Sequence, residues 1–353
     1  MKEGKFNIII GGQAGSESKG KLSGYLCEKC HPNLLVMTSS PNAGHTVVNQ
    51  DGVKYVSYHL PVGSVMCDCS IVLGPASLIN LNTFVEEIKD LGIDPSRIII
   101  DPRASVITSA NIKRELDVGL SNIGSTLQGI GECRTTKMKR DGTAILIDHV
   151  SDVLHKMGIR IEPTSPIINN TIRNDGIVLC ETTQGFDLDL EHGINPIHCT
   201  SKMINPAMAM AEAGVSPAHL GTVYGVIRPY PIRVNNRTGY SGSYGSSNEI
   251  SWEEVSKMCG SPEKLLELTT TTKLPRRVFD FCWDRIYKFA EICNPDQICL
   301  QFANYIDWSI YGKTEADSIP KLVEYWIKAL EMRLVIPVTY VGTGPNHQHM
   351  IEL

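Results

Sequence analysis

The stretch Gly11–Lys21, GGQAGSESKGK, combines glycines and lysines in a pattern suited to binding phosphate. Gly15 and Gly20-Lys21 fit the spacing G-x-x-x-x-G-K, but Leu22 follows where a phosphate loop of the usual kind carries a serine or threonine for magnesium. The pattern therefore disfavours an ordinary P-loop NTPase. The electrostatics remain, because N–H groups at a helix N-terminus, with Lys19 and Lys21, favour phosphate. A glycine-rich turn with solvated lysines is the simpler alternative for one short match.

A second motif follows a predicted strand. The apolar run NLLVMTSS, residues 33–40, leads into Asn42-Ala43-Gly44-His45-Thr46. Open α/β sheets bind ligands at the carboxyl ends of their strands, so Asn42 and His45 are candidates for a ligand site. A single histidine is more often structural, and the motif therefore gains weight only beside the first loop.

Short apolar runs alternate with helical patterns, which predicts an α/β fold with a mostly parallel central sheet, helices on both faces and additional hairpins. Asp51-Gly52 predicts a type I′ hairpin within residues 45–60. The Ser/Gly/Asn-rich residues 235–249 predict a long mobile loop of functional importance. Strands are predicted within residues 6–10, 33–40, 70–75, 97–102, 176–181, 297–302 and 335–342, and helices within 19–27, 77–92 and 320–332.

The composition is that of an ordinary globular chain. Hydrophobic residues make up 42% and charged residues 20% of the 353 positions, which argues against disorder. The net charge of −5 gives no reason to expect binding to nucleic acid or to a membrane surface. No repeat or linker divides the chain, so we expect one domain over residues 1–353.

The cysteines and the N-terminus indicate a cytoplasmic protein. The apolar part of MKEGKFNIIIGG is too short for a signal peptide, and no run approaches a transmembrane span. Eleven cysteines without an export signal favour a reducing compartment. Cys27 with Cys30 and Cys67 with Cys69 raise the question of zinc, but the second pair is too closely spaced for the usual zinc knuckle. We therefore favour free thiols for all four.

The two opening motifs together resemble those of the adenylosuccinate synthetase family, G-Q-W-G-D-E-G-K-G-K followed by N-A-G-H-T. Residues 12–21 and 42–46 follow them closely and at the expected distance apart. Six further matches run in family order along the chain: Ile123–Thr126 with Gly129–Gly131, Glu181–Gly185, His192–Ser201, Tyr224–Val226 with Arg233-Val234, Thr271-Thr272 with Arg276-Arg277, and Gly344-Pro345. The resemblance thus covers nearly the whole sequence.

The resemblance implies a ligase that works in two steps. A purine 6-oxygen attacks the γ-phosphate of a nucleoside triphosphate, and the amine of L-aspartate then displaces phosphate from C6. Catalysis of the first step is a matter of positioning and charge. The resemblance assigns catalytic roles to Lys19, His45 and Gln184 and to position 16, and implies Mg²⁺ held by the phosphates, position 16 and the Gly44 carbonyl.

The resemblance also assigns the binding residues. The purine monophosphate would contact Ser16, Asn42, Ser125, Thr126, Gln184, Cys199 and Thr200, with Arg140 reaching in from the neighbouring subunit of a homodimer. Aspartate would contact Thr271, Thr272 and Arg276. The triphosphate would contact Gly15, Glu17, Ser18, Lys19, Gly20, Lys21, Gly44, His45, Thr46, Phe302, Asn304, Asp307, Gly342, Gly344 and Pro345.

Ser16 departs from the family, which has an aspartate there as general base on N1 and magnesium ligand. An aspartate with a pKa near ~3.9 is ionised at neutral pH, whereas a serine hydroxyl is not an equivalent base. Ser16 therefore indicates either a protein that binds nucleotides without turnover or a changed substrate, since a short neutral side chain leaves room beside C2 for a 2-amino group.

Three further positions depart in a consistent direction. Phe302 and Asn304 replace the lysine and aspartate that read guanine on GTP, and an aromatic ring can stack on adenine instead. Leu274 replaces an arginine that reaches the ribose 2′-hydroxyl, which favours a deoxyribose substrate. Together with Ser16, these changes resemble the viral branch of the family, which serves phages that replace adenine by 2,6-diaminopurine.

That branch joins dGMP to L-aspartate with ATP or dATP, in the host cytoplasm if the chain is phage-encoded. Two alternatives remain: an ordinary family member acting on IMP with GTP, and a nucleotide-binding protein without turnover. The retained Lys19, His45, Gln184 and Arg276 argue against the second.

Overall fold

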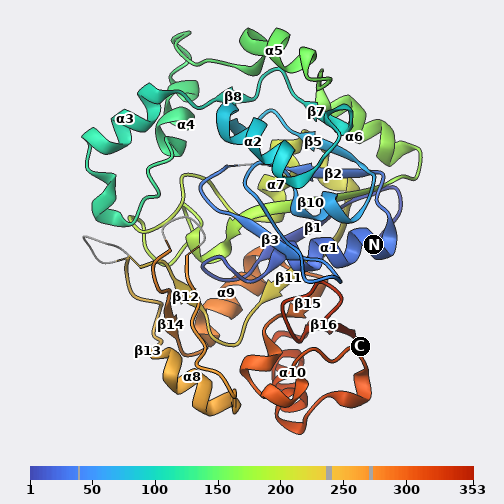
Figure 1. The fold of residues 1–353 in the computed structure, drawn as a ribbon, viewed down its shortest axis with the longest axis vertical. Helices are drawn as coiled ribbons and strands as arrows, with labels where there is room; N and C mark the ends of the chain where they lie inside the picture. The colour runs from blue at the N-terminus through green and yellow to red at the C-terminus, as the bar shows by residue number, and fades with distance from the viewer. Residues whose placement is uncertain (39, 236–240, 270–272) are drawn as a thin grey trace.

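A ten-stranded sheet forms the centre of the molecule (Figure 1). The computed structural model describes residues 1–38, 40–235, 241–269 and 273–353. Each strand runs parallel to its neighbours, except that β17 is antiparallel to β16. The predicted mostly parallel α/β sheet is therefore confirmed. In spatial order the strands are β17 (Met350–Glu352), β16 (Val338–Gly342), β15 (Gln297–Leu300), β11 (Leu220–Ile227), β1 (Lys5–Gly11), β10 (Ile177–Gly185), β2 (Leu34–Met37), β5 (Ser70–Leu73), β7 (Ile98–Ile100) and β9 (Arg160–Ile161).

Helices cover both faces of this sheet and extend beyond it. In Figure 1, α3 and α4 lie together at one upper corner, whereas α8 and α10 lie at the opposite end of the molecule. The helices are α1 (Lys19–Cys30), α2 (Leu81–Leu91), α3 (Ser109–Asp117), α4 (Ile130–Lys139), α5 (Ser151–Lys156), α6 (Thr164–Arg173), α7 (Pro206–Ala213), α8 (Trp252–Cys259), α9 (Trp283–Cys293) and α10 (Lys321–Leu334).

The central strand β1 shows why the sheet is covered on both faces. Its sequence KFNIIIG is buried almost throughout, as expected for a strand inside a parallel sheet. Successive side chains of a strand point to opposite faces. Ile8 and Ile10 pack in the cluster that includes residues of α6, α7, α9 and α10, whereas Ile9 packs with Leu22 and Leu26 of α1. Each fully buried isoleucine contributes roughly 1.5–3 kcal/mol, so β1 anchors both layers.

Three small sheets flank the large one. They are formed by β12 (Ile232–Arg233), β14 (Arg277–Phe279) and β13 (Glu249–Ile250), by β3 (His45–Val48) with β4 (Lys54–Ser57), and by β6 (Leu78–Ile79) with β8 (Ser105–Val106). The β3–β4 hairpin is confirmed, but its predicted type I′ turn is wrong. The N–H of Gly52 donates to the Asn49 carbonyl at 3.1 Å, and Gly52 has a φ of 80°, whereas Asp51 does not have a positive φ. This is the longer type I turn followed by a left-handed glycine.

The predicted mobile loop, residues 235–249, is anchored where the structure describes it. Residues 236–240 lie outside the described part of the chain. Tyr244 is fully buried, packs against Phe279 with ring centroids 5.6 Å apart, and donates its hydroxyl to Asp187 at 2.5 Å. The prediction of mobility is therefore not supported for residues 241–249. No helix within the described residues is long and apolar enough to cross a bilayer.

Candidate functional site

A cavity of about 810 Å³ lies among the loops that follow the carboxyl ends of the central strands. Loops after β1, β2 and β10 contribute to its wall, at the edge where open α/β sheets bind ligands. The structure thus brings together residues that are far apart in the sequence. The predicted site residues on the wall are Gly15, Ser16, Ser18, Lys19, Gly20, Asn42, Gly44, His45, Thr46, Ser125, Thr126, Gln184, Cys199, Thr200, Arg276, Phe302 and Pro345.

The glycine-rich loop of the first motif is organised around a glutamate of its own. The buried Glu17 carboxylate accepts the N–H groups of Gln13 and Gly15 at 3.1 and 2.7 Å and the Lys19 ammonium at 2.9 Å. Glu17 therefore does not line the cavity but shapes the loop that does. Ser16 and Ser18 both have left-handed backbone conformations, with φ of 59° and 70°. These turns bring the two serines to the cavity wall.

Lys21 lies away from the cavity, contrary to its predicted contact with triphosphate. Its Nζ donates to the carbonyl oxygens of Gly344 and His349, each at 2.7 Å, and burial lowers the pKa of this lysine to about 7. Lys19 and Lys21 are two residues apart on α1, and residues at this spacing point to different sides of a helix. Only Lys19 faces the cavity; Lys21 ties α1 to the segment after β16.

Gly20 brings the two sequence motifs together. A Cβ at this position would lie 2.7 Å from the Thr46 carbonyl oxygen and 2.6 Å from Val62 Cγ1. A larger residue would push the helix away from β3. The close approach places the first turn of α1 beside His45 and Thr46, which begin β3 and line the cavity.

His45 forms a buried pair with Glu181 of β10. His45 Nδ1 lies 2.5 Å from Glu181 Oε1, and the side chains are 5% and 0% exposed. Burial opposes ionisation of Glu181, but the hydrogen bond and charge of His45 outweigh burial and hold the pKa of this carboxyl below its usual range. Since Nδ1 faces the carboxylate, Nε2 is the nitrogen left to act on a ligand. The sequence motif identified His45 but did not indicate its partner.

The predicted purine-side residues are linked to one another. Gln184, at the end of β10 with a φ of 69°, donates its Nε2 to Asn42 Oδ1 at 2.9 Å. Ser125 and Thr126 lie in the loop before α4. Glu115, which the sequence analysis missed, holds that loop by accepting the N–H groups of Gly129 and Gly131 at 2.8 and 2.9 Å. A buried carboxylate fourteen residues before a glycine-rich turn carries no local sequence signal.

Arg276 reaches the cavity as part of an ion-pair group. Its Nη1 donates to Glu267 Oε2 at 3.2 Å, and Glu267 also pairs with Arg228. Burial lowers the pKa of Arg276 while the Glu267 carboxylate opposes this effect. Glu267 was not predicted as a site residue, although it lines the cavity. The predicted aspartate ligands Thr271 and Thr272 lie outside the described residues.

Phe302, Asn304 and Asp307 belong to the segment that was predicted to bind the base of the triphosphate. Of these three residues, Phe302 alone lines the cavity. Phe302 has a φ of 58° and lines the wall. Asn304 is buried and does not line the cavity. Asp307 accepts the Ser309 N–H at 3.0 Å and hydroxyl at 2.7 Å, and so caps a short 3₁₀ turn. Its side chain is thus engaged locally.

Three other predicted residues lie outside the cavity wall. Gly342 is a buried residue of β16 paired with Met350, and the Gly344 carbonyl accepts the bond from Lys21. Arg140 is exposed and ends α4 in a left-handed conformation, with a φ of 57°. Arg140 does not line the cavity of its own chain.

The two residues that the resemblance implies as magnesium ligands fit a Mg²⁺ ion that is bound by few protein groups. Ser16 and Gly44 both line the cavity and offer oxygen atoms, the donors that Mg²⁺ prefers. Mg²⁺ commonly binds few protein groups and completes its shell with water and phosphate oxygens. Within the described residues, no group of three or more His, Cys, Asp or Glu side chains is arranged to hold a metal. The eleven cysteines are free thiols, with Cys67 Sγ 3.0 Å from Cys69 Sγ.

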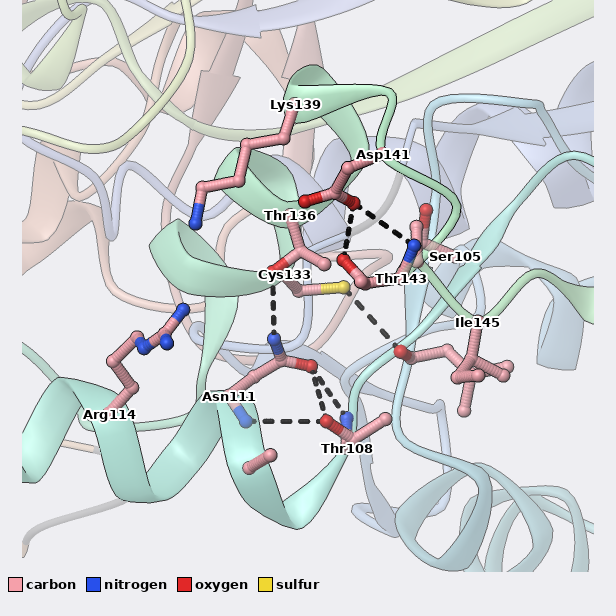
Figure 2. A pocket seen from close by; sticks show the side chains of 13 residues that line it. Ser105, Thr108, Asn111, Arg114, Cys133, Thr136, Lys139, Asp141, Thr143 and Ile145 are labelled. Carbon is pink, nitrogen blue, oxygen red and sulfur yellow. Dashed lines mark hydrogen bonds between the residues drawn. The ribbon is translucent and has the colours of Figure 1, made fainter.

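A second cavity, of about 340 Å³, lies between α3, α4 and residues 141–145 (Figure 2). Its polar groups largely bind one another: Asn111 Nδ2 donates to Thr136 Oγ1 at 3.3 Å, and Asp141 accepts the Thr143 N–H at 3.0 Å. Among the described residues, none of the predicted site residues lines it. The candidate site is therefore the larger cavity.

The sequence and the fold are similar to those of known proteins. Residues 8–157 and 145–307 match the family described as adenylosuccinate synthetase. The chain is 35% identical over 308 residues to the N6-succino-2-amino-2'-deoxyadenylate synthase of Vibrio phage phiVC8, covering 85% of this chain and 86% of that protein. It is 32% identical over 353 residues to the adenylosuccinate synthetase of Methanococcus vannielii, covering 98% of each.

The fold is also similar to that of a solved structure. The succinoaminodeoxyadenylate synthetase of cyanophage S-2L, bound to dGMP and to dATP as an energy donor, superposes with a TM-score of 0.83 at 31% identity. The alignment covers 99% of this chain and 95% of that one. Since relatives with both names have comparable identity, the choice between their substrates depends on individual site residues.

Proposed function

The chain belongs to the adenylosuccinate synthetase family, and we propose that it is a C–N ligase that joins L-aspartate to C6 of dGMP with hydrolysis of ATP or dATP. The product is 2-amino-2'-deoxy-N6-succinyladenylate. The observation that carries this proposal is Ser16 on the cavity wall, at the family's aspartate position. The names of the phage relatives, and the dGMP and dATP bound to the cyanophage protein, support the same substrates.

Ser16 supports dGMP because of its size and charge. An aspartate at this position would set a carboxylate beside the purine C2, whereas the serine hydroxyl is smaller and can hydrogen-bond a 2-amino group. Leu274 supports the deoxy sugar, since it stands where the family carries an arginine for the 2'-hydroxyl. The two departures therefore favour the same nucleotide.

In the proposed reaction, the 6-oxygen of the purine attacks the γ-phosphorus of ATP, and the bond from that phosphorus to ADP breaks. The aspartate amine then attacks C6 and expels phosphate. Lys19 supplies positive charge at the phosphates, and His45, held by Glu181, donates a hydrogen bond towards the 6-oxygen and the transferring group. Mg²⁺, held by phosphate oxygens, the Ser16 hydroxyl and the Gly44 carbonyl, would neutralise part of the phosphate charge.

The remaining roles are proposed for side chains that line the cavity. Gln184 and Asn42 hold the purine nucleotide, with Ser125, Thr126, Cys199 and Thr200 around its phosphate. Arg276 grips an aspartate carboxylate, and Phe302 stacks on the adenine of the triphosphate. We further propose a homodimer, in which the exposed Arg140 enters the neighbouring subunit's site.

The test is a substrate matrix. Purified protein is incubated with aspartate, Mg²⁺ and each pairing of dGMP, GMP or IMP with ATP or GTP, and succinylated products are identified by mass spectrometry. We expect product from dGMP with ATP. Product chiefly from IMP with GTP would identify an ordinary adenylosuccinate synthetase, and binding of dGMP and ATP without product would identify a non-catalytic protein.

A further inference from the structure

Arg228 directly follows β11 and is fully buried, with both terminal nitrogens of its guanidinium engaged. Its Nη1 donates to the Ser16 carbonyl oxygen at 3.0 Å and to Glu267 Oε2 at 3.1 Å, and its Nη2 pairs with the other oxygen of Glu267. The guanidinium carbon lies 4.1 Å from the centre of the Phe302 ring. Arg228 itself does not line the cavity, whereas Ser16, Glu267 and Phe302 do.

The backbone of Arg228 is held as firmly as its side chain. Gln13 is also fully buried; its Oε1 accepts the Arg228 N–H at 2.8 Å, and its Nε2 donates to the Arg228 carbonyl at 2.9 Å. Two hydrogen bonds to one residue fix the position of its Cα, and the fork to Glu267 fixes the plane of the guanidinium. The cation behind Phe302 is therefore rigid.

Phe302 lies in a turn and not in a regular strand or helix. It has a left-handed φ of 58°, follows the end of β15 and precedes a three-residue 3₁₀ turn. Tyr305 contacts its ring at 5.2 Å with a tilt of 42°, which is not a parallel stack. A planar guanidinium against an aromatic ring restricts the orientation of that ring.

We propose that Arg228 is a positioning residue that sets the plane of Phe302 and thereby determines the preference of the triphosphate site for adenine. Arg228 covers the side of the ring that faces the protein and leaves the ring free to stack on a base in the cavity. The proposal rests on the function proposed above, in which Phe302 contacts the base of the triphosphate.

Lysine is the informative substitution. Arg228→Lys retains the positive charge for Glu267 but cannot stack a plane on Phe302, and its single nitrogen cannot bond both carboxylate oxygens and the Ser16 carbonyl in the same fork geometry. If Arg228 acts by orienting the Phe302 ring, its effect should therefore be lost in this variant. If Arg228 acts through its charge alone, its effect should be kept.

The experiment is a double-mutant cycle on nucleotide selectivity. The ratio of kcat/KM for ATP to kcat/KM for GTP is measured for the wild type, Arg228→Lys, Phe302→Leu and the double variant, each with the purine monophosphate that the wild type turns over best. We expect Arg228→Lys to lower this ratio on the order of ten-fold, to raise KM for ATP more than KM for the monophosphate, and to add little to Phe302→Leu, because residues acting through one contact are not additive.

Arg285→Lys is the matched control. Arg285 pairs with Asp187 at 2.7 Å and lies 5.7 Å over the ring of Phe186, but none of these three residues lines the cavity. Arg285→Lys should lower the midpoint of unfolding without changing the ratio of kcat/KM for ATP to kcat/KM for GTP. If Arg228→Lys does not fold, Glu267→Gln, which loosens the fork but keeps the arginine, should lower the ratio in the same direction.

The outcomes separate this proposal from the function on which it rests. A wild type that prefers ATP, with an unchanged ratio in both Arg228→Lys and Glu267→Gln, would overturn the role of Arg228 alone. Independent, additive effects of Arg228→Lys and Phe302→Leu would also overturn it. A wild type that prefers GTP would instead contradict the proposed triphosphate site. Turnover of IMP rather than dGMP would contradict the proposed monophosphate substrate, but the double-mutant cycle could still be measured with IMP.

Discussion

His45 and Glu181, 136 residues apart in the sequence, form a buried pair in which Nδ1 of the imidazole lies 2.5 Å from a carboxylate oxygen. The pair joins the start of the β3–β4 hairpin to the central strand β10. A carboxylate on one ring nitrogen fixes the orientation of the imidazole and leaves Nε2 to face a ligand. The geometry therefore suits His45 to stabilise the negative charge that develops on the 6-oxygen and the phosphoryl group.

We expect His45→Ala to reduce kcat by about 10²–10³ while leaving dGMP binding largely intact, because loss of one preorganised donor removes transition-state stabilisation. Rapid-quench kinetics and calorimetric binding of dGMP would measure the two effects. Turnover within a few-fold of the wild type would remove His45 from the mechanism.

Arg276→Lys should raise KM for aspartate more than KM for either nucleotide, because lysine cannot reproduce a bidentate grip on a carboxylate. Steady-state kinetics with each substrate varied in turn would measure this. Arg277→Lys is a matched control, since Arg277 pairs with Glu249 and does not line the cavity. An equal rise in KM for all three substrates would indicate structural damage instead.

ATP or dATP should be preferred to GTP. Guanine presents N1–H and N2 donors, and the residue at the family's aspartate position is Asn304, which is neutral and buried outside the cavity wall. A buried donor without a partner costs roughly 1–3 kcal/mol, which corresponds to about ten-fold or more in affinity. Equal kcat/KM for ATP and GTP would contradict this interpretation of Phe302 and Asn304.

Lys21 should make stability depend on pH. Its pKa is lowered to about 7 in the fold, whereas an unfolded lysine titrates near ~10.4. Between these values the unfolded chain binds more protons, so the free energy of unfolding rises with pH in this window. The stability of the wild type relative to Lys21→Met should therefore increase by roughly 2–3 kcal/mol from pH 7 to pH 9. Urea unfolding at both pH values would measure the difference, and a constant difference would show that Lys21 does not titrate there.

Ser16→Asp should abolish turnover of dGMP and shift residual activity towards dIMP, which carries only hydrogen at C2. The carboxylate would crowd the 2-amino group and repel the phosphates unless Mg²⁺ binds it. The backbone does not forbid the change, because Ser16 is left-handed with a φ of 59° and aspartate tolerates this conformation. The readout is the ratio of kcat/KM for dGMP to that for dIMP.

Ser18→Asp is the control for this substitution. Ser18 lies in the same loop, lines the same cavity and also has a left-handed φ, of 70°. It should lower activity through charge without favouring dIMP. If Ser16→Asp leaves the dGMP-to-dIMP ratio unchanged, Ser16 does not determine specificity and another residue reads the 2-amino group.

The sequence by itself determined the central sheet, and it predicted where the candidate site lies relative to that sheet. The Ile8–Ile10 run predicts a strand buried on both faces, and the motifs after β1 and β2 predict a site at the carboxyl ends of parallel strands. The inferred strand is confirmed, because apolar periodicity is a local property of the sequence. The sequence also contained the reason why Lys21 lies away from Lys19, since two residues on a helix differ by about 200° in direction.

Only the tertiary structure decided which charged groups meet. Glu17 was predicted to contact triphosphate but instead binds the loop N–H groups, and Glu115, Glu181, Arg228 and Glu267 took their roles from partners remote in the chain. A buried charge must find a partner wherever the fold brings one close, because leaving it unpaired is costly. That requirement is met by the packing of strands and loops in space, and the order of residues along the chain does not encode it locally.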